Sequence, residues 1–239
     1  MKNIFRFAWL ILMLVQIPAY GQNVQTINDW VNYKKYAEAD SSLPPSAPGE
    51  NRVVFMGNSI TESWAVIDSG FFAGHGYIGR GISGQTSAQM LLRFRQDVIA
   101  LKPTVVVILA GTNDIAENAG PISLEDVLGN IISMTELAQR NGITVILCSV
   151  LPAYDFRWHK GLQPAEKIVK LNAMIKSYCD ENHVPYVDYH SAMVDERKGL
   201  DAKYSKDGVH PTYDGYKVMD ALIEKEIEAV LKSNGNPKN

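Results

Sequence analysis

Short apolar runs alternate with longer stretches of helical periodicity along most of the chain. Runs of about five apolar residues bounded by turn-forming residues are typical of buried strands, whereas apolar residues at every third or fourth position indicate amphipathic helices. This pattern predicts strands at residues 53–56, 76–80, 104–110, 143–148 and 184–188, and helices at 86–100, 123–140, 165–182 and 212–232. Alternating strands and helices favour βαβ units, so we expect a parallel sheet covered by helices on both faces.

Residues at the ends of two predicted helices support these boundaries. Ser123 begins the second helix as a cap, and the acidic residues after it oppose the positive end of the helix dipole. Asn141-Gly142 ends the same helix with residues that tolerate a positive φ. Pro211 is expected in the first turn of the last helix, where its missing N–H has little cost, so His210 is predicted at a helix entrance.

Residues 1–21 have the pattern of a signal peptide. Lys2 and Arg6 precede an apolar stretch over residues 7–17, and small residues at positions 19 and 21 suit cleavage after Gly21. A retained N-terminal anchor is the alternative, but the run is shorter than the roughly 20 apolar residues that span a bilayer. No cysteine lies near the cleavage point, which argues against a lipid anchor. We therefore expect an exported protein, periplasmic or secreted.

The remaining chain divides into a short N-terminal segment and one domain. Residues 22–50 combine a predicted aromatic-rich helix at 28–40 with a proline-rich connector at 41–49, because prolines fix the chain out of a helix. Residues 51–235 carry the alternating strands and helices. A single α/β domain of this length is ordinary.

Charge and hydropathy limit the expected partners. The chain of 239 residues has a formal net charge of −3 and no cluster of Lys or Arg, so it lacks the basic surface typical of nucleic-acid binding. No segment after the signal peptide is apolar enough to span a bilayer, and no stable membrane insertion is expected after cleavage. A small molecule or a glycan is the expected partner, and the oligomeric state is left open.

Cys148 and Cys179 both fall in apolar surroundings, the first in a predicted strand and the second in a predicted helix. Both are typical of small core residues. An oxidising compartment would allow them to form a disulfide, but the spacing in sequence does not show whether their positions meet the geometric requirement. Both alternatives stay open.

A nucleophile and a base with its orienting group are present at distant positions. A serine hydroxyl reacts well when a base accepts its proton and a carboxylate holds that base in the right tautomer. Asp207 lies three residues before His210, which lets its carboxylate accept from Nδ1–H and leaves Nε2 for Ser59. Simpler explanations exist, because such pairs occur in surface loops and serine is favoured as a helix N-cap.

Two further residues have both a chemical and a structural interpretation. Asn113 follows a predicted strand, where it would either point its amide at a developing negative charge or form an Asx-turn. Gly84 would either bring a backbone N–H close to a substrate oxygen or serve as a turn glycine. Both follow strands of a parallel sheet, whose carboxyl edge is where ligands bind.

Four segments together resemble the sequence blocks of the SGNH hydrolases, also called GDSL-type esterases and lipases. They are Gly57-Asn58-Ser59-Ile60-Thr61, Gly81-Ile82-Ser83-Gly84, Gly111-Thr112-Asn113-Asp114 and Asp207-Gly208-Val209-His210-Pro211, in family order. The resemblance spans residues 50–230 and identifies 51–235 as an SGNH hydrolase domain. It implies a flavodoxin-like three-layer α/β/α sandwich with a five-stranded parallel sheet.

The resemblance also implies a role for each matching residue. Ser59 is the expected nucleophile, His210 the base and Asp207 its orienting carboxylate. Gly84 and Asn113 join the backbone N–H of Ser59 as expected oxyanion donors. Asn58 and Ile60 depart from the name motif, which has Asp and Leu there, but neither change removes a catalytic group.

A loop after the fourth predicted strand carries exposed aromatic and cationic side chains. Tyr154, Arg157 and Trp158 lie in it and are the expected substrate-binding residues; a hydrophobic lid or packing segment is the alternative. The remaining histidines form no cluster with ligand spacing, so no metal and no cofactor is expected.

We therefore expect a serine esterase that removes short acyl groups, acetyl in particular, from carbohydrates or small alcohols through an acyl-enzyme intermediate. No long apolar insertion follows the catalytic segments from which a lipid tunnel would form. A lysophospholipase-like or platelet-activating-factor-acetylhydrolase-like lipid esterase is one alternative. A non-catalytic glycan-binding protein that keeps the fold is the other.

Overall fold

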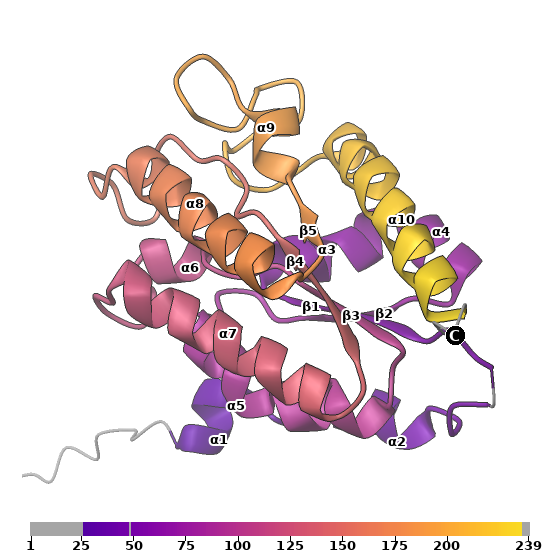
Figure 1. Cartoon of the computed structure of the whole chain (residues 1–239). Coiled ribbons are helices and arrows are strands. Elements are labelled where there is room, and N and C mark those ends of the chain that lie inside the picture. The colour runs from indigo at the N-terminus through magenta and orange to yellow at the C-terminus, as the bar shows by residue number, and fades with distance from the viewer. Residues whose placement is uncertain (1–25, 48, 236–239) are drawn as a thin grey trace, which may run out of the picture.

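A central sheet of five parallel strands organises the protein (Figure 1). The computed structural model describes residues 26–47 and 49–235; the predicted signal peptide lies outside them. The strands are β1 (Val53–Gly57), β2 (Ile78–Gly81), β3 (Val105–Ile108), β4 (Thr144–Cys148) and β5 (Tyr186–Val187). Their order is β2-β1-β3-β4-β5, which is the flavodoxin-like order, and the expected fold class is confirmed.

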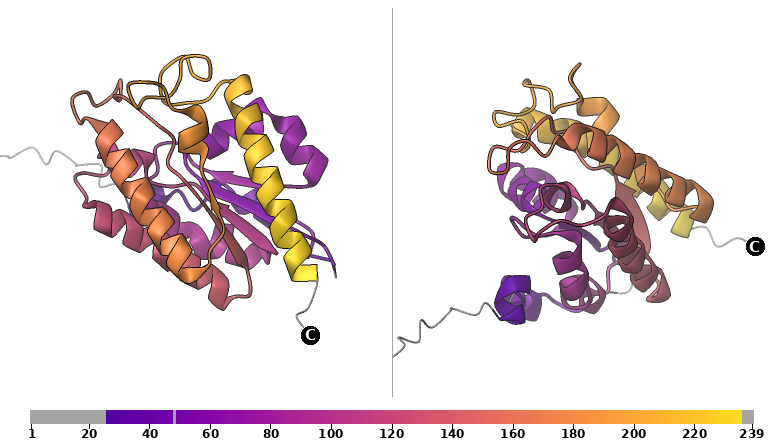
Figure 2. Two further views of the ribbon diagram at one scale, coloured as in Figure 1. Left: turned by 45° about the horizontal axis from the view of Figure 1, so that its top comes forward. Right: turned by 90° about the vertical axis from the view of Figure 1, so that its left-hand side faces the viewer.

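Helices cover both faces of the sheet (Figure 2). On one face lie α5 (Ser87–Asp97), α7 (Leu124–Arg140) and α8 (Pro164–Asn182). On the other lie α3 (Ser59–Ile67), α4 (Ser69–His75), α9 (Tyr189–Met193) and α10 (Tyr213–Gly235). Two short elements complete this part of the chain, η1 (Ile99–Leu101) and α6 (Thr112–Ile115).

The two central strands explain why the strand predictions succeeded. Every residue of β1 and β3 is buried, because helices cover both faces of the sheet. A strand in that position is a continuous apolar run instead of an alternating one. The single-turn helix α6 is too short to have a periodic pattern in the sequence, and it was not predicted. The short helices α3, α4 and α9 were not predicted either.

The N-terminal segment differs from its prediction. Instead of one helix over 28–40, the chain forms α1 (Ile27–Val31) and α2 (Ala37–Ser42). Asn32 has a φ of 57°, a left-handed conformation that ends α1. The helical periodicity of the sequence did not predict this break between the two helices.

Side chains of α5 hold the N-terminal segment against the domain. Gln89 donates to the Trp30 carbonyl and Gln96 to the Tyr33 carbonyl, each over 2.7 Å. Figure 1 shows α1 beside α5 accordingly. The segment before β1 is thus packed on the helical layer.

The predicted position of Pro211 is wrong. The last helix begins at Tyr213, and Pro211 pairs in a bridge with Ser205 before it. Thr212 donates from its backbone N–H (2.7 Å) and its hydroxyl (3.2 Å) to the Tyr204 carbonyl, which holds this stretch extended. His210 therefore lies in a loop three positions before α10 and not at the helix entrance itself.

Cys148 and Cys179 are free thiols in the core. Both are at most 2% exposed, and burial raises the pKa of each thiol to about 12. They therefore behave as small apolar residues.

Among the helices of residues 26–47 and 49–235, none has the length and apolar character to cross a membrane.

Candidate active site

The strand order brings distant segments to one edge of the sheet. β1 lies between β2 and β3, so the carboxyl ends of these three strands are adjacent. The segments that follow them carry Ser59, Gly84 and Asn113. The order of strands reverses between β1 and β3, and such switch points form the ligand-binding crevice of open α/β sheets.

Ser59 is the first residue of α3, directly after the β1 strand. Asn58 is the N-cap, because its Oδ1 accepts from the backbone N–H of Ile60 over 3.1 Å. The interpretation of Ser59 as the capping side chain is therefore wrong, and its hydroxyl is available for another partner. The amide at Asn58 still caps the turn, as a carboxylate would.

The Ser59 hydroxyl, His210 and Asp207 form a continuous hydrogen-bonded chain. Ser59 Oγ lies 2.9 Å from Nε2 of His210, and Nδ1 of His210 lies 2.8 Å from Oδ2 of Asp207. With Nδ1 protonated toward the carboxylate, Nε2 is the acceptor that faces the serine hydroxyl. This is the geometry of an activated serine nucleophile.

Asp207 is held in place and kept ionised by its own loop. Its Oδ1 accepts from the backbone N–H groups of Val209 (2.9 Å) and His210 (2.8 Å) and from the Ser205 hydroxyl (3.1 Å). Partial burial opposes ionisation, but the hydrogen bonds from His210 and Val209 outweigh it and lower the pKa of Asp207 to about 2. A charged carboxylate therefore faces the imidazole at all ordinary assay pH values.

Two other carboxylates, Asp114 and Asp155, hydrogen-bond to groups other than His210. Asp114 accepts from the backbone N–H and hydroxyl of Ser87, and burial raises its pKa. Asp155 accepts from the N–H groups of Phe156 and Gly161 in its own loop. Asp114 therefore joins α6 to the start of α5, whereas Asp155 supports its own loop.

Gly84 occupies a tight turn after β2. Gln85 donates its N–H to the Ile82 carbonyl over 3.3 Å, and Gly84 has a φ of 78°. Residues with a Cβ rarely adopt a positive φ, so the conformation of this turn explains why a glycine occupies position 84. A Cβ there would have no heavy atom within 4 Å, and Gly84 is exposed.

Asn113 lies in the one-turn helix α6 and is 3% exposed. Its Nδ2 donates to the Gln85 carbonyl over 2.9 Å, which joins the turn after β3 to the turn after β2. The side chain thus crosses between the two segments and does not form the Asx-turn that was its simpler interpretation.

Arg93 is a buried support of this site that the sequence patterns did not indicate. It is 0% exposed, donates to the Gly57 carbonyl (2.8 Å) and to the Gln85 side chain (2.6 Å), and pairs with Asp97. It therefore ties the end of β1 to the Gly84 turn. On a helix, an Arg four residues before an Asp has the spacing of an ordinary exposed ion pair, so its burial could not be predicted from the sequence.

Residues 55–218 match the model of the GDSL-like lipase/acylhydrolase family. The chain belongs to this family. All five residues of the hydrogen-bonded chain and the expected oxyanion hole lie within the matched region: Ser59, Gly84, Asn113, Asp207 and His210. The family model describes GDSL-like lipases and acylhydrolases.

Solved structures of the family are similar over most of the chain. A GDSL-like lipase from Bacteroides thetaiotaomicron is 53% identical with a TM-score of 0.82, covering 84% of this chain and 98% of that one. A candidate acylhydrolase from Bacteroides fragilis is 52% identical with a TM-score of 0.84, covering 85% of this chain and 99% of that one.

Curated relatives are more distant. An acetylxylan esterase from Xylanibacter ruminicola is 24% identical over 87% of this chain and 48% of its own length. The chain spans half or less of the length of the curated relatives that it matches.

The loop after β4 brings one aromatic residue of this GDSL-like chain close to His210. The Trp158 ring lies 6.5 Å from the His210 ring and is 49% exposed, whereas Phe156 beside it is fully buried. Tyr154 and Arg157 instead line a cavity of about 210 Å³ that borders Asp207 and Gly208. The loop therefore combines a packing residue with exposed ones.

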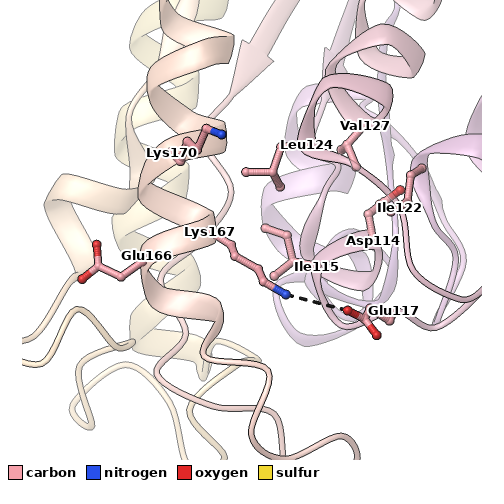
Figure 3. Close-up of a pocket in the computed structure, with 9 residues that line it drawn as sticks. All are labelled: Asp114, Ile115, Glu117, Ile122, Leu124, Val127, Glu166, Lys167 and Lys170. Carbon is pink, nitrogen blue, oxygen red and sulfur yellow. Dashed lines mark ion pairs between the residues drawn. The ribbon is translucent and has the colours of Figure 1, made fainter.

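A second cavity lies on the other side of α6 (Figure 3). It has a volume of about 340 Å³ and is closed at one side by Lys167 of α8, which pairs with Glu117 over 3.7 Å. Asp114 and apolar residues of α7 line it, but within the described chain it includes neither Ser59 nor His210.

In the described residues, no three His, Cys, Asp or Glu side chains gather closely enough to hold a metal ion.

Proposed function

We propose that this protein is a serine esterase that hydrolyses short-chain acyl esters, acetyl esters in particular, of carbohydrates or small alcohols. The observation that carries the proposal is the chain from Ser59 Oγ through both ring nitrogens of His210 to Asp207, with contacts of 2.9 and 2.8 Å. Such a chain activates a hydroxyl for attack on a carbonyl carbon.

The first half-reaction forms an acyl-enzyme. Ser59 Oγ attacks the ester carbonyl while Nε2 of His210 accepts its proton, and the carbonyl oxygen becomes an oxyanion. The backbone N–H groups of Ser59 and Gly84 and the amide of Asn113 donate to that oxyanion. Collapse of the intermediate breaks the bond to the alcohol, which leaves with the proton from His210.

The second half-reaction releases the acid. A water molecule replaces the alcohol, and its oxygen attacks the acyl carbon while His210 accepts its proton. The bond between the acyl carbon and Ser59 Oγ then breaks, His210 returns the proton to Oγ, and the acid leaves. Asp207 stays ionised throughout, so it stabilises the imidazolium that forms in each half-reaction.

Three observations favour a short acyl group on a sugar or small alcohol. The half-exposed Trp158 beside His210 offers an apolar face against which the alcohol part can pack. The cavity bordered by Tyr154 and Arg157 is small and carries cations and hydrogen-bond donors. The similarity to an acetylxylan esterase extends over 87% of the chain.

A chain-length series separates this proposal from a lipid esterase. We expect the highest kcat/KM on p-nitrophenyl acetate, with a steep fall toward the octanoate and palmitate, and release of acetate from acetylated xylo-oligosaccharides. A maximum at long acyl chains would favour the lysophospholipase-like or platelet-activating-factor-acetylhydrolase-like alternative.

A fluorophosphonate probe tests the nucleophile without any choice of substrate. We expect labelling of the wild-type protein at Ser59, located by peptide mass spectrometry, and none of Ser59→Ala. A folded wild-type protein that resists the probe would favour a non-catalytic glycan-binding protein with the same fold.

We further propose that the protein is exported, with cleavage after Gly21. The support is the charged, apolar and small-residue pattern of residues 1–21. Intact-mass measurement of the protein from its cells should give a mature chain that begins at Gln22, and cell fractionation should separate periplasmic from secreted material.

A further inference from the structure

Asn118, five residues after Asn113, uses every polar function of its side chain at the edge of the proposed oxyanion hole. Its Nδ2 donates to Oδ1 of Asn113 (3.0 Å) and to the Gly84 carbonyl (3.2 Å). Its Oδ1 accepts from Nε1 of Trp158 (2.9 Å). An exposed amide ordinarily hydrogen-bonds with water, so three contacts with site residues are a specific arrangement.

The contact with Asn113 fixes which way the Asn113 amide points. Oδ1 of Asn113 accepts from Asn118, while Nδ2 donates to the Gln85 carbonyl and keeps a second N–H. A half-turn of the amide would place Nδ2 against a donor and Oδ1 against a carbonyl oxygen. Both hydrogen bonds would then be lost and replaced by repulsion.

The contact with Trp158 fixes the position of the indole ring beside His210. The indole is anchored at its nitrogen by Asn118 and packs on the buried Phe156 ring, with centroids 5.0 Å apart. Its face consequently stays next to His210. One amide thus connects the oxyanion side of the site with the base side.

The backbone places Asn118 for these contacts. Glu117 adopts a φ of 56°, and the N–H of Asn118 donates to the Asn113 carbonyl over 3.0 Å, so the chain doubles back after α6. The ion pair of Glu117 with Lys167 holds the same turn against α8 (Figure 3).

We propose that Asn118 is a positioning residue of the active site, which orients the Asn113 amide and the Gly84 turn for oxyanion stabilisation and anchors Trp158 beside His210. The proposal rests on the esterase function proposed above. Asn118 acts through its neighbours and takes no part in bond making or breaking.

The deciding variant is Asn118→Asp, which keeps an acceptor for Trp158 but replaces the donor to Asn113 and Gly84 with an oxygen. We expect kcat on p-nitrophenyl acetate to fall about ten- to a hundredfold with KM changed less than about threefold, because small misplacements of a catalytic group have effects of that size. Asn182→Asp is the matched control: Asn182 is exposed at the end of α8, contacts only the Tyr178 carbonyl through its side chain among the described residues, and should leave kcat unchanged.

A double-mutant cycle separates positioning from a general structural effect. If Asn118 acts through Asn113, Asn118→Asp should lower kcat much less in an Asn113→Ala background than in the wild-type background. Fully additive losses, or a kcat for Asn118→Asp within twofold of wild type, would overturn the assignment.

Wild-type controls separate this assignment from the proposed function. A wild-type protein that hydrolyses p-nitrophenyl acetate, together with an inactive Ser59→Ala, supports the function and makes the cycle a test of Asn118 alone. A wild-type protein without esterase activity overturns both. Melting temperatures of the variants, expected within a few degrees of wild type because Asn118 is exposed, show that the losses do not come from unfolding.

Discussion

Ser59 Oγ and Nε2 of His210 lie 2.9 Å apart although 151 positions separate the two residues. Packing between α3 and α10 sets this distance. The Tyr216 hydroxyl donates to the Ile60 carbonyl over 2.8 Å, and the buried Trp64 indole donates to Asp220 over 2.8 Å. These bonds join the helix that begins with Ser59 to the helix that follows His210, so the pair is aligned before any substrate binds.

Ser59→Ala should abolish turnover and leave the fold intact. The loss in kcat should approach a million-fold, the size found when a triad nucleophile is removed from a serine protease. Initial rates on p-nitrophenyl acetate measure it, with circular dichroism as the control for folding. Substantial residual turnover would mean that another group is the nucleophile.

Asn113→Ala should lower kcat by about a hundred- to a thousandfold with little change in KM, because an oxyanion donor acts mainly in the transition state. Steady-state kinetics on the same ester separate the two parameters. A change confined to KM would show that Asn113 positions the substrate instead.

Asp207→Asn should change both the pH profile and the maximal rate. The pKa of Asp207 is about 2, so the wild-type carboxylate is charged across the assay range and does not itself produce an acid limb there. Removing its negative charge makes a protonated His210 less stable, so the acid limb of the profile should move to lower pH.

The maximal rate of Asp207→Asn should fall by up to about ten-thousandfold, because the amide no longer holds the right tautomer of His210. The measurement is kcat/KM from pH 5 to 9. Asp180→Asn serves as the control, since Asp180 is exposed on α8 and its carboxylate pairs with Lys176. An unchanged limb and maximum for Asp207→Asn would remove Asp207 from the mechanism.

Gly81→Ala should destabilise the protein by about 2–3 kcal/mol, because a Cβ at the end of β2 would overlap backbone atoms of the α3 turn. Its nearest neighbours include the Asn58 carbonyl at 2.6 Å and the Thr61 carbonyl carbon at 2.7 Å, which flank Ser59. Esterase activity should therefore fall as well. Urea denaturation measures the free energy of unfolding.

Gly74→Ala is the matched control for Gly81→Ala. Gly74 lies in α4, and a Cβ there would contact nothing, so alanine should raise stability by up to about 1 kcal/mol through helix propensity. Equal effects at the two positions would contradict the close approach of β2 to the α3 turn.

The sequence by itself determined the fold class and indicated the candidate residues of the site. The buried strands of a parallel sheet must be apolar on both faces, so β1 and β3 are continuous apolar runs that can be located without a structure. The motif residues Ser59 and His210 could be proposed because their side-chain chemistry, order and spacing form a recognisable pattern.

Tertiary structure decided which polar groups meet and what supports them. Pro211 stays outside α10 because Tyr204, seven residues earlier in the chain, accepts from Thr212, and no local propensity reports such a contact. Arg93 and Asn118 are polar residues with ordinary local patterns. Their roles depend on partners from other segments, such as the Gly57 and Gly84 carbonyls, which only the order of the strands brings within hydrogen-bonding distance.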